Sequence, residues 1–283
     1  MDKSTKYVAP ESVNDAVRLL AEHGGQVAVV AGGTDIVPKI NYYELAPGII
    51  MSIGRLGLDY IQESDGALII GAGTSMAKIS ASELITEKAG ALAAAAASLG
   101  SPAIRTAATV GGNLVNGSPA ADTATPLLVM DAELKLVSDA GERTVPLADF
   151  FVGSGETVLK TNELLTEITV PMPKGKTVFV KLGRRKGMTC SIVNVAVRLE
   201  IDRDKCLDAR IAVGSMAPTP LRCRKAEALI KGRNIDSEVI KECSAAAIDE
   251  TSPIDDERAA AWYRKQAGTA VLARALREAS GQA

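Results

Sequence analysis

The sequence predicts an α+β protein, with an α/β N-terminal part followed by a three-stranded antiparallel sheet and a helix bundle. In the first part, β-branched apolar runs that end in glycine alternate with segments of helical periodicity. Beyond residue 176, three strand-like runs separated by turn residues predict an antiparallel meander. Residues 221–279 then carry helical periodicity. Because 283 residues exceed the usual size of one domain, we expect two domains, or one domain with subdomains.

The composition is that of a folded globular protein, with 47% hydrophobic and 23% charged residues. A formal net charge of -2 argues against non-specific binding to nucleic acid, which needs an excess of Lys and Arg. The first residues contain no apolar leader, and no apolar run reaches about 18 residues. We therefore expect neither secretion nor a membrane span, and predict a cytoplasmic protein.

The four cysteines are Cys190, Cys206, Cys223 and Cys243, which lie 16, 17 and 20 residues apart. This is not the clustered spacing of zinc or iron–sulfur ligands, so they are predicted to be structural thiols, and no metal site is expected. The single histidine, His23, excludes any mechanism that needs a histidine pair.

Local signals place the first elements. Ser12 precedes a segment in which Val13, Val17 and Leu20 fall on one helical face, and Gly24 follows, so a short amphipathic helix is predicted. Residues 27–31 then predict a buried strand that runs into a glycine turn.

The apolar runs in residues 47–56 and 66–76 predict two more strands, each entering a loop. The Ala-rich stretch from Ser82 to Leu99 predicts a helix. Residues 125–130 predict another helix, followed by two strands that turn at 139–141. Residues 163–173 alternate in polarity and end in prolines. The Pro- and Gly-containing stretch 171–176 is therefore the best candidate domain boundary.

Two glycine-rich segments are candidate phosphate sites. The sequence AGGTD, residues 31–35, follows a buried strand, and TVGGN, residues 109–113, forms a second predicted loop. Consecutive backbone amides in such turns bind phosphate, and two of them favour a pyrophosphate lying between them. A plain turn remains the alternative for each segment alone.

Two further segments allow two interpretations each. Asp122 either accepts a hydrogen bond from a ribose or a ring N–H, or caps the helix that follows it. The basic run KLGRRKG, residues 181–187, is either a solvated hairpin or a cationic lid over an anionic ligand. No nucleophile with its base and no acid/base carboxylate pair is apparent, so the chemistry is expected to belong to a bound cofactor.

Three longer stretches identify a family resemblance. They are YVAPESVNDAVRLLAEHGGQVAVVAGGTDIVPKI at the start, ATVGGNLVNGSPAADTATPLLVMDAEL in the middle, and RRKGMTCSIVNVAVRL with DERAAAWYRKQAGTAVLARAL near the end. In this order and spacing, the chain resembles the FAD-binding (medium) subunit of the molybdenum hydroxylases, which include the flavoprotein subunits of xanthine dehydrogenase and carbon monoxide dehydrogenase. The resemblance covers nearly the whole chain.

The resemblance implies an FAD-binding domain over residues 1–173, of the PCMH type, with subdomains of about 1–54 and 55–173. A C-terminal flavoprotein domain of three strands and three helices would occupy 174–283. FAD would lie against both glycine segments, and the chain would supply no catalytic residue and no metal ligand. The implied cofactor-binding residues are Val29, Val30, Ala31, Gly32, Gly33, Thr34, Asp35, Ile36, Leu99, Gly100, Thr109, Gly111, Gly112, Asn113, Val115, Asn116, Asp122, Leu165 and Lys181.

The function implied is electron transfer. FAD would accept electrons from [2Fe-2S] clusters on a small partner subunit, fed by a large molybdopterin subunit, and pass them to NAD+ or another acceptor, in a dimer of heterotrimers. The chain departs from many relatives at Thr189-Cys190-Ser191, where they read Asp-Ile-Ala. Two alternatives stay open: a stand-alone FAD oxidoreductase, and an assembly subunit without a cofactor.

Overall fold

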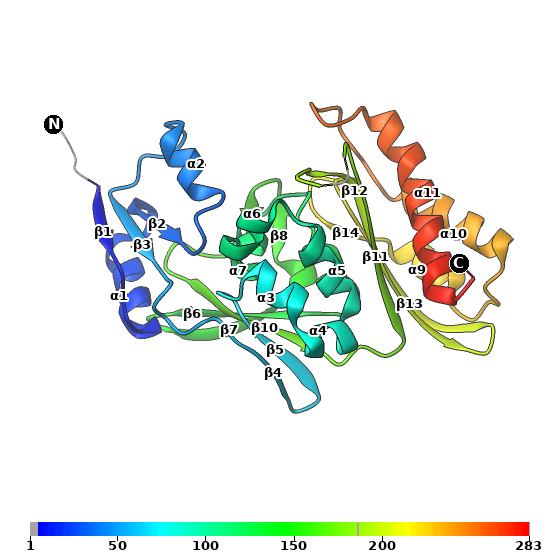
Figure 1. Ribbon diagram of the computed structural model, residues 1–283, viewed down its shortest axis with the longest axis horizontal. Coiled ribbons are helices and arrows are strands. Elements are labelled where there is room, and N and C mark those ends of the chain that lie inside the picture. The colour runs from blue at the N-terminus through cyan, green and yellow to red at the C-terminus, as the bar shows by residue number, and fades with distance from the viewer. Residues whose placement is uncertain (1–4, 186, 283) are drawn as a thin grey trace.

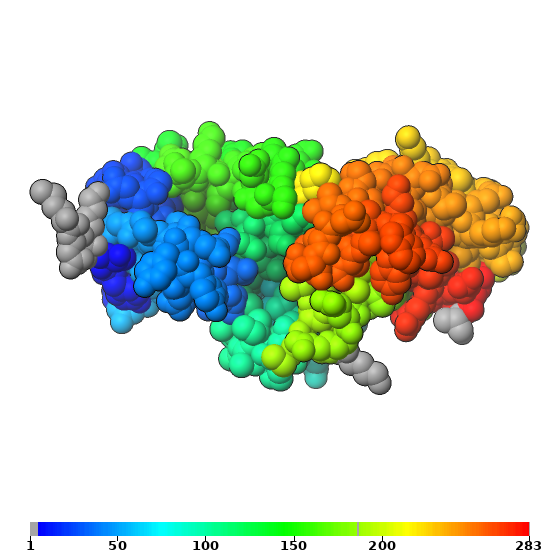
Figure 2. All heavy atoms as spheres, turned by 90° about the horizontal axis from the view of Figure 1, so that it is seen from above, coloured from blue at the N-terminus to red at the C-terminus, as the bar shows by residue number. Residues whose placement is uncertain are grey.

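The computed structural model describes residues 5–185 and 187–282. Three units follow one another along the long axis of the molecule (Figure 1). Seen from above, the N-terminal unit and the C-terminal domain occupy opposite ends, with the middle unit between them (Figure 2). The expected α+β architecture is confirmed.

The N-terminal unit is a three-stranded parallel sheet with the order β1-β3-β2. Its elements are β1 (Lys6–Val8), α1 (Val13–His23), the 3-10 helix η1 (Gly24–Gln26), β2 (Val27–Val30), α2 (Ile36–Asn41) and β3 (Ile49–Ser52). The Ser12 hydroxyl accepts a hydrogen bond from the amide of Asp15 at the start of α1, and Gly24 ends it with φ of 40°. The buried face of α1, as predicted, includes Val17 and Leu20.

The middle unit is a five-stranded antiparallel sheet, β4-β5-β10-β6-β7, with short helices packed against it. Its strands are β4 (Ile61–Ser64), β5 (Ala67–Gly71), β6 (Glu133–Ser138), β7 (Gly141–Pro146) and β10 (Leu164–Pro171), and the pair β8 (Phe151–Gly153) and β9 (Glu156–Thr157) lies outside the sheet. Its helices are α3 (Met76–Ala81), α4 (Glu83–Lys88), α5 (Gly90–Ser98), α6 (Pro102–Ala107), α7 (Val110–Val115), α8 (Ala124–Val129) and the 3-10 helix η2 (Leu147–Asp149).

The C-terminal domain is a sheet in the order β11-β12-β13-β14, with three helices. Its elements are β11 (Lys176–Gly183), β12 (Ser191–Asp202), β13 (Lys205–Gly214), β14 (Leu221–Arg222), α9 (Arg224–Ile230), α10 (Ser237–Asp249) and α11 (Ala261–Ser280). Seven consecutive residues of β12, from Ser191 to Val197, are buried. Alternate residues of the strand pack in different cores: Ala196 belongs to the core of the middle unit, whereas Val195 and Val197 pack with the helices of the C-terminal domain. The C-terminal sheet is therefore covered on both faces.

The short elements β1, β4, α2, α3, α6 and α7 are not among those predicted, and two predicted elements differ in detail. The C-terminal sheet contains the three predicted long strands and a fourth, two-residue strand, β14, too short to give a sequence pattern. The predicted helix 82–99 is two helices, because Ala89 leaves helical geometry with φ of -139° and ψ of 48° between α4 and α5.

Three of the four cysteines, Cys206, Cys223 and Cys243, lie in the core of the C-terminal domain, and Cys190 is exposed. Burial raises the pKa of Cys206 to about 11 and that of Cys243 to about 12, so both are neutral thiols at physiological pH. In the part of the chain that the structure describes, no helix is both long and apolar enough to cross a membrane.

Candidate cofactor-binding cleft

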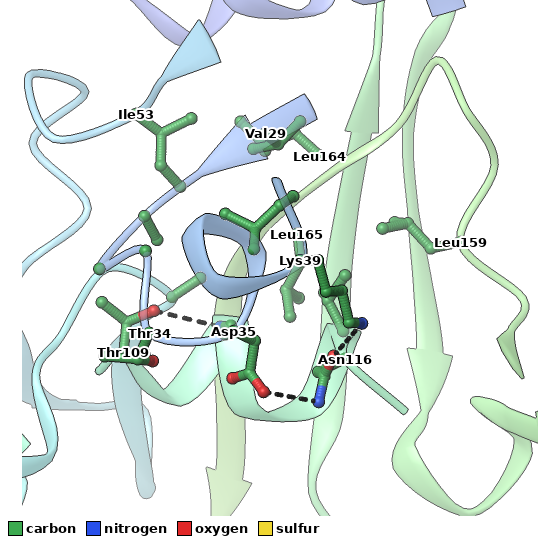
Figure 3. Close-up of a pocket in the computed structure, with 18 of the residues that line it drawn as sticks. Val29, Thr34, Asp35, Lys39, Ile53, Thr109, Asn116, Leu159, Leu164 and Leu165 are labelled. Carbon is green, nitrogen blue, oxygen red and sulfur yellow. Dashed lines mark hydrogen bonds between the residues drawn. The ribbon is translucent and has the colours of Figure 1, made fainter. Parts of the chain in front are cut away.

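A cavity of about 320 Å³ lies between the N-terminal unit and the middle unit. Both glycine-rich segments line it, together with Leu165. The predicted residues found in its lining are Val29, Ala31, Gly32, Gly33, Thr34, Asp35, Ile36, Thr109, Gly111, Gly112, Val115, Asn116 and Leu165. Figure 3 shows several of them around the space.

The first glycine segment supplies free backbone donors. The turn between β2 and α2 requires glycine twice, because a Cβ on Gly32 would lie 1.8 Å from the carbonyl oxygen of Ala107, and Gly33 has φ of +72°. Within the described residues, none of the amides from Gly32 to Ile36 donates a hydrogen bond to another residue. Five consecutive amides are therefore available to an anionic group.

The second glycine segment differs from its prediction. It is not a loop but the first turn of α7, with Thr109 as N-cap. Its amides already have partners: Val110 donates to the carbonyl of Thr74, Gly111 to that of Ala72, and Gly112 to the Thr109 hydroxyl. This segment therefore contributes a surface without side chains rather than free donors.

Close packing explains one of these glycines, and the cleft the other. A Cβ on Gly111 would lie 2.7 Å from both Cβ and the carbonyl oxygen of Ala72, so the packing of α7 requires glycine there. Gly112 is exposed, and a Cβ there would meet only the Thr109 Oγ1, at 3.0 Å. The open space beside Gly112 belongs to the cleft that both residues line.

Three polar side chains span the cleft between α2 and α7 (Figure 3). The Asn116 side chain donates to Asp35 Oδ1 at 3.2 Å, and Lys39 Nζ donates to Asn116 Oδ1 at 3.3 Å. Asp35 is the N-cap of α2, Lys39 lies on that helix, and Asn116 is the C-cap of α7. The N-terminal unit and the middle unit are thus joined across the cavity by hydrogen bonds at the long end of the normal range.

The remaining wall is apolar and is held by an ion pair in which Glu163 is buried and Arg143 is partly exposed. Leu159, Leu164 and Leu165 line the cavity. Glu163, in the same segment, accepts from Arg143 Nε at 2.7 Å and Nη2 at 2.8 Å, and Arg143 also donates to the carbonyl of Val158. The hydrogen bond from Arg143 holds the pKa of Glu163 below its ordinary value. This pair fixes the segment that carries the apolar wall.

Six predicted residues lie outside the lining of this cavity: Val30, Leu99, Gly100, Asn113, Asp122 and Lys181. The carbonyls of Leu99 and Gly100 accept hydrogen bonds from Arg105. The Asn113 side chain accepts one from the Thr123 hydroxyl at 2.6 Å. These contacts give the carbonyls of residues 99 and 100 and the Asn113 amide a role within the protein.

Asp122 and Lys181 form a buried ion pair between the middle unit and the C-terminal sheet. Lys181 Nζ lies 2.6 Å from Asp122 Oδ2, and the two side chains are 9% and 7% exposed. The Ser191 hydroxyl donates to Asp122 Oδ1 at 2.5 Å, and the Asn194 side chain donates to it at 3.3 Å. Burial raises the pKa of Asp122, whereas Lys181 and these two donors oppose that rise.

Of the two alternatives for Asp122, the helix cap is wrong. Asp122 does not cap α8, for which the N-cap is Thr123. Lys181 lies in the hairpin of β11 and β12, but its side chain is buried, whereas Arg184 and Arg185 beyond it are exposed. Lys186 of the same basic run lies outside the described residues. Lys181 lines a second cavity of about 390 Å³ with Ser98, Leu182, Gly183, Arg185 and Thr189.

The first cavity described, between the N-terminal and middle units, is called the main cavity below. Seven residues that line it were not predicted: Lys39, Ile53, Ala72, Gly155, Leu159, Glu163 and Leu164. Lys39 follows Asp35 by four residues on a helix, which places both on one face, so its spacing was a usable signal. Leu164 is the neighbour of Leu165. The others come from strands and turns that only the tertiary fold brings together.

Comparison with known protein families gives two matches along the chain. Residues 3–173 match the family described as the FAD binding domain in molybdopterin dehydrogenase. Residues 178–279 match the CO dehydrogenase flavoprotein C-terminal domain.

Individual relatives extend over nearly the same length. The 6-hydroxypseudooxynicotine dehydrogenase complex subunit alpha of Paenarthrobacter nicotinovorans is 34% identical over 280 residues, which is 98% of this chain and 94% of the relative. The xanthine dehydrogenase FAD-binding subunit of Escherichia coli O157:H7 is 32% identical and covers 91% of this chain and 90% of the relative.

The fold also matches a solved structure. A chain of the carbon monoxide dehydrogenase of Hydrogenophaga pseudoflava, in a form that lacks the Mo-pyranopterin moiety of the molybdenum cofactor, superposes with a TM-score of 0.95. The two chains are 31% identical, and the match covers 98% of each.

Proposed function

The chain belongs to the family of FAD-binding subunits of molybdopterin dehydrogenases, and from this premise we propose that it is the electron-transfer subunit of a molybdenum-containing hydroxylase. When bound, FAD supplies reversible acceptance and release of electrons. The electrons would come from [2Fe-2S] clusters on a small subunit, and the acceptor would be NAD+ or another electron acceptor.

The observation that carries the proposal is the row of free amides from Gly32 to Ile36 on the wall of the cleft. A dinucleotide brings a diphosphate with two negative charges, and backbone amides in a glycine turn are suitable donors for it. The exposed glycine on the facing helix, Gly112, leaves room for a ligand that a side chain would otherwise fill. The residues of this cleft therefore fit the cofactor.

The other residues of the cleft fit the apolar part of the same ligand. Val29, Ile53 and Leu165 line the cavity, and they would exclude water from the adenine ring at one end of the cofactor. Lys181 and Asp122 stay proposed cofactor contacts: Lys181 would bring a cation to the second cavity, which it lines with Thr189.

The partners follow from the family. The names of the relatives describe subunits of larger dehydrogenases, so we propose a large molybdopterin subunit and a small [2Fe-2S] subunit, as a dimer of heterotrimers. The relatives act on different substrates, and the proposal therefore stops at the class of complex. A cytoplasmic location stays part of the proposal.

The test is purification of the chain alone and with its neighbouring gene products. We expect a yellow protein with one FAD per chain, and a three-subunit complex whose flavin is bleached by the substrate of the molybdenum subunit. The chain alone, loaded with FAD, should oxidise no such substrate; oxidation by it would support a stand-alone oxidoreductase instead. A colourless chain that still assembles would support the assembly subunit.

A further inference from the structure

We propose that Lys39 is a further cofactor-binding residue, which gives up its hydrogen bond to Asn116 and pairs with the diphosphate of the bound dinucleotide. This assignment rests on the proposed function and deepens it. Among the described residues that line the main cavity, Lys39 is the only basic one.

The ionised side chains in the cavity lining are mostly negative, which makes a cation useful for binding an anion. The lining contains two carboxylates, those of Asp35 and Glu163. Arg143 already neutralises Glu163 through two hydrogen bonds, but Arg143 itself does not line the cavity. A diphosphate would add two negative charges to this lining, and Lys39 is the only side chain there, among the described residues, that carries a full positive charge.

The geometry gives Lys39 access to the same place as the free amides. It lies on α2, four residues after Asp35 and three after Ile36, so it occupies the same helical face as the end of the row from Gly32 to Ile36. Its Nζ reaches Asn116, which belongs to the facing helix α7. The ammonium group therefore lies between α2 and α7, beside the cavity that residues of both helices line (Figure 3).

The present partner of Lys39 is a weak one. The distance from Nζ to Asn116 Oδ1 is 3.3 Å, the acceptor is a neutral amide, and both residues are at least partly exposed. A phosphate oxygen is an ionised acceptor, which forms shorter and stronger hydrogen bonds with an ammonium group. Exchange of partners is therefore favourable once the diphosphate is present.

The experiment compares ligands with and without phosphate. Full-length chain freed of flavin is titrated with FAD, FMN and riboflavin, for the wild type and for Lys39→Met, Lys39→Arg and Lys241→Met. Lys241 is the matched control, because its side chain is 78% exposed on α10, which does not line the cavity. Thermal unfolding of every variant checks that the fold is retained.

We expect Lys39→Met to weaken FAD binding about 10- to 100-fold, the range of a hydrogen bond to a charged group. Riboflavin should bind this variant as it binds the wild type, Lys39→Arg should recover most of the FAD affinity, and Lys241→Met should match the wild type. The FAD affinity of the wild type should fall more steeply with added salt than that of Lys39→Met.

Two results would overturn the assignment. One is an unchanged FAD affinity in Lys39→Met. The other is an equal loss of affinity for FAD and for riboflavin, which would mean that Lys39 only holds the N-terminal unit and the middle unit together. Both presume that the wild type binds FAD. A wild type that binds no FAD would refute the proposed function itself, and the assignment of Lys39 with it.

Discussion

Replacing Gly112 by alanine separates cofactor binding from stability. The residue is exposed within α7, and alanine is favoured over glycine inside a helix by about 1 kcal/mol. The added methyl group would meet only Thr109 Oγ1, at 3.0 Å. A small shift of that hydroxyl weakens an N-cap hydrogen bond worth about 1 kcal/mol. The two effects oppose each other, so the free energy of unfolding should change by less than about 1 kcal/mol.

The same methyl group enters the cleft that would hold the cofactor. Overpacking of a well-filled site costs about 1–3 kcal/mol, which corresponds to about 5- to 150-fold in Kd. Gly112→Ala should therefore keep the melting temperature within about 4 °C of the wild type and lose FAD affinity by that factor. Fluorescence titration with FAD and a thermal scan of the same preparation measure both quantities.

Gly32→Ala is the contrasting variant. Its methyl group would lie 1.8 Å from the carbonyl oxygen of Ala107, so the turn after β2 must move away from that backbone, and the protein should be destabilised by about 1–3 kcal/mol or more. If Gly112→Ala binds FAD like the wild type, the cofactor does not lie against α7 at this point. If it unfolds as early as Gly32→Ala, the glycine serves the fold instead.

Three further predictions concern the ion pairs and the second cavity. Glu163→Gln should destabilise the protein by about 1–3 kcal/mol at pH 7. Because folding lowers the pKa of Glu163, this difference in the free energy of unfolding should shrink as the pH falls below the ordinary pKa of 4.5. A difference that does not depend on pH would contradict the pairing with Arg143. Lys181→Met should destabilise by about 3–5 kcal/mol, because it leaves the buried Asp122 without its cation, and the double variant with Asp122→Asn should recover much of that loss in chemical denaturation. Thr189→Asp should have a lower flavin midpoint potential than the neutral Thr189→Asn, since a negative charge disfavours the anionic reduced flavin. Equal midpoint potentials of the two variants in a redox titration would refute an electrostatic effect of residue 189 on the flavin.

Local signals were sufficient where the structure depends on neighbours in sequence. Helix α1 was predicted as observed from the Ser12 cap, the apolar face with Val17 and Leu20, and the glycine at position 24. The glycine turn after β2 was also predicted, because it follows an apolar β-branched strand, although only Ala28 of that strand is fully buried. In both places, residues close together in the sequence determine the local backbone conformation.

The sequence was misleading where a contact comes from far along the chain. The glycines of TVGGN indicated a loop. Position 111 is instead a glycine because α7 packs so closely against Ala72, 39 residues earlier, that no side chain fits. The basic run at 181–187 indicated a solvated hairpin or a lid, and neither pattern predicts that Lys181 is buried against Asp122, 59 residues away. Neither distance leaves a pattern in a single sequence.

The most direct test of the central claim is residue-resolved amide hydrogen exchange of the full chain with and without FAD. The five amides from Gly32 to Ile36 should become strongly protected when FAD binds, because they gain their first acceptors. Those of Val110 to Gly112 should change little, since they are already bonded within the protein. An unchanged exchange rate across the first segment, with FAD bound, would contradict the proposal that this turn holds the diphosphate.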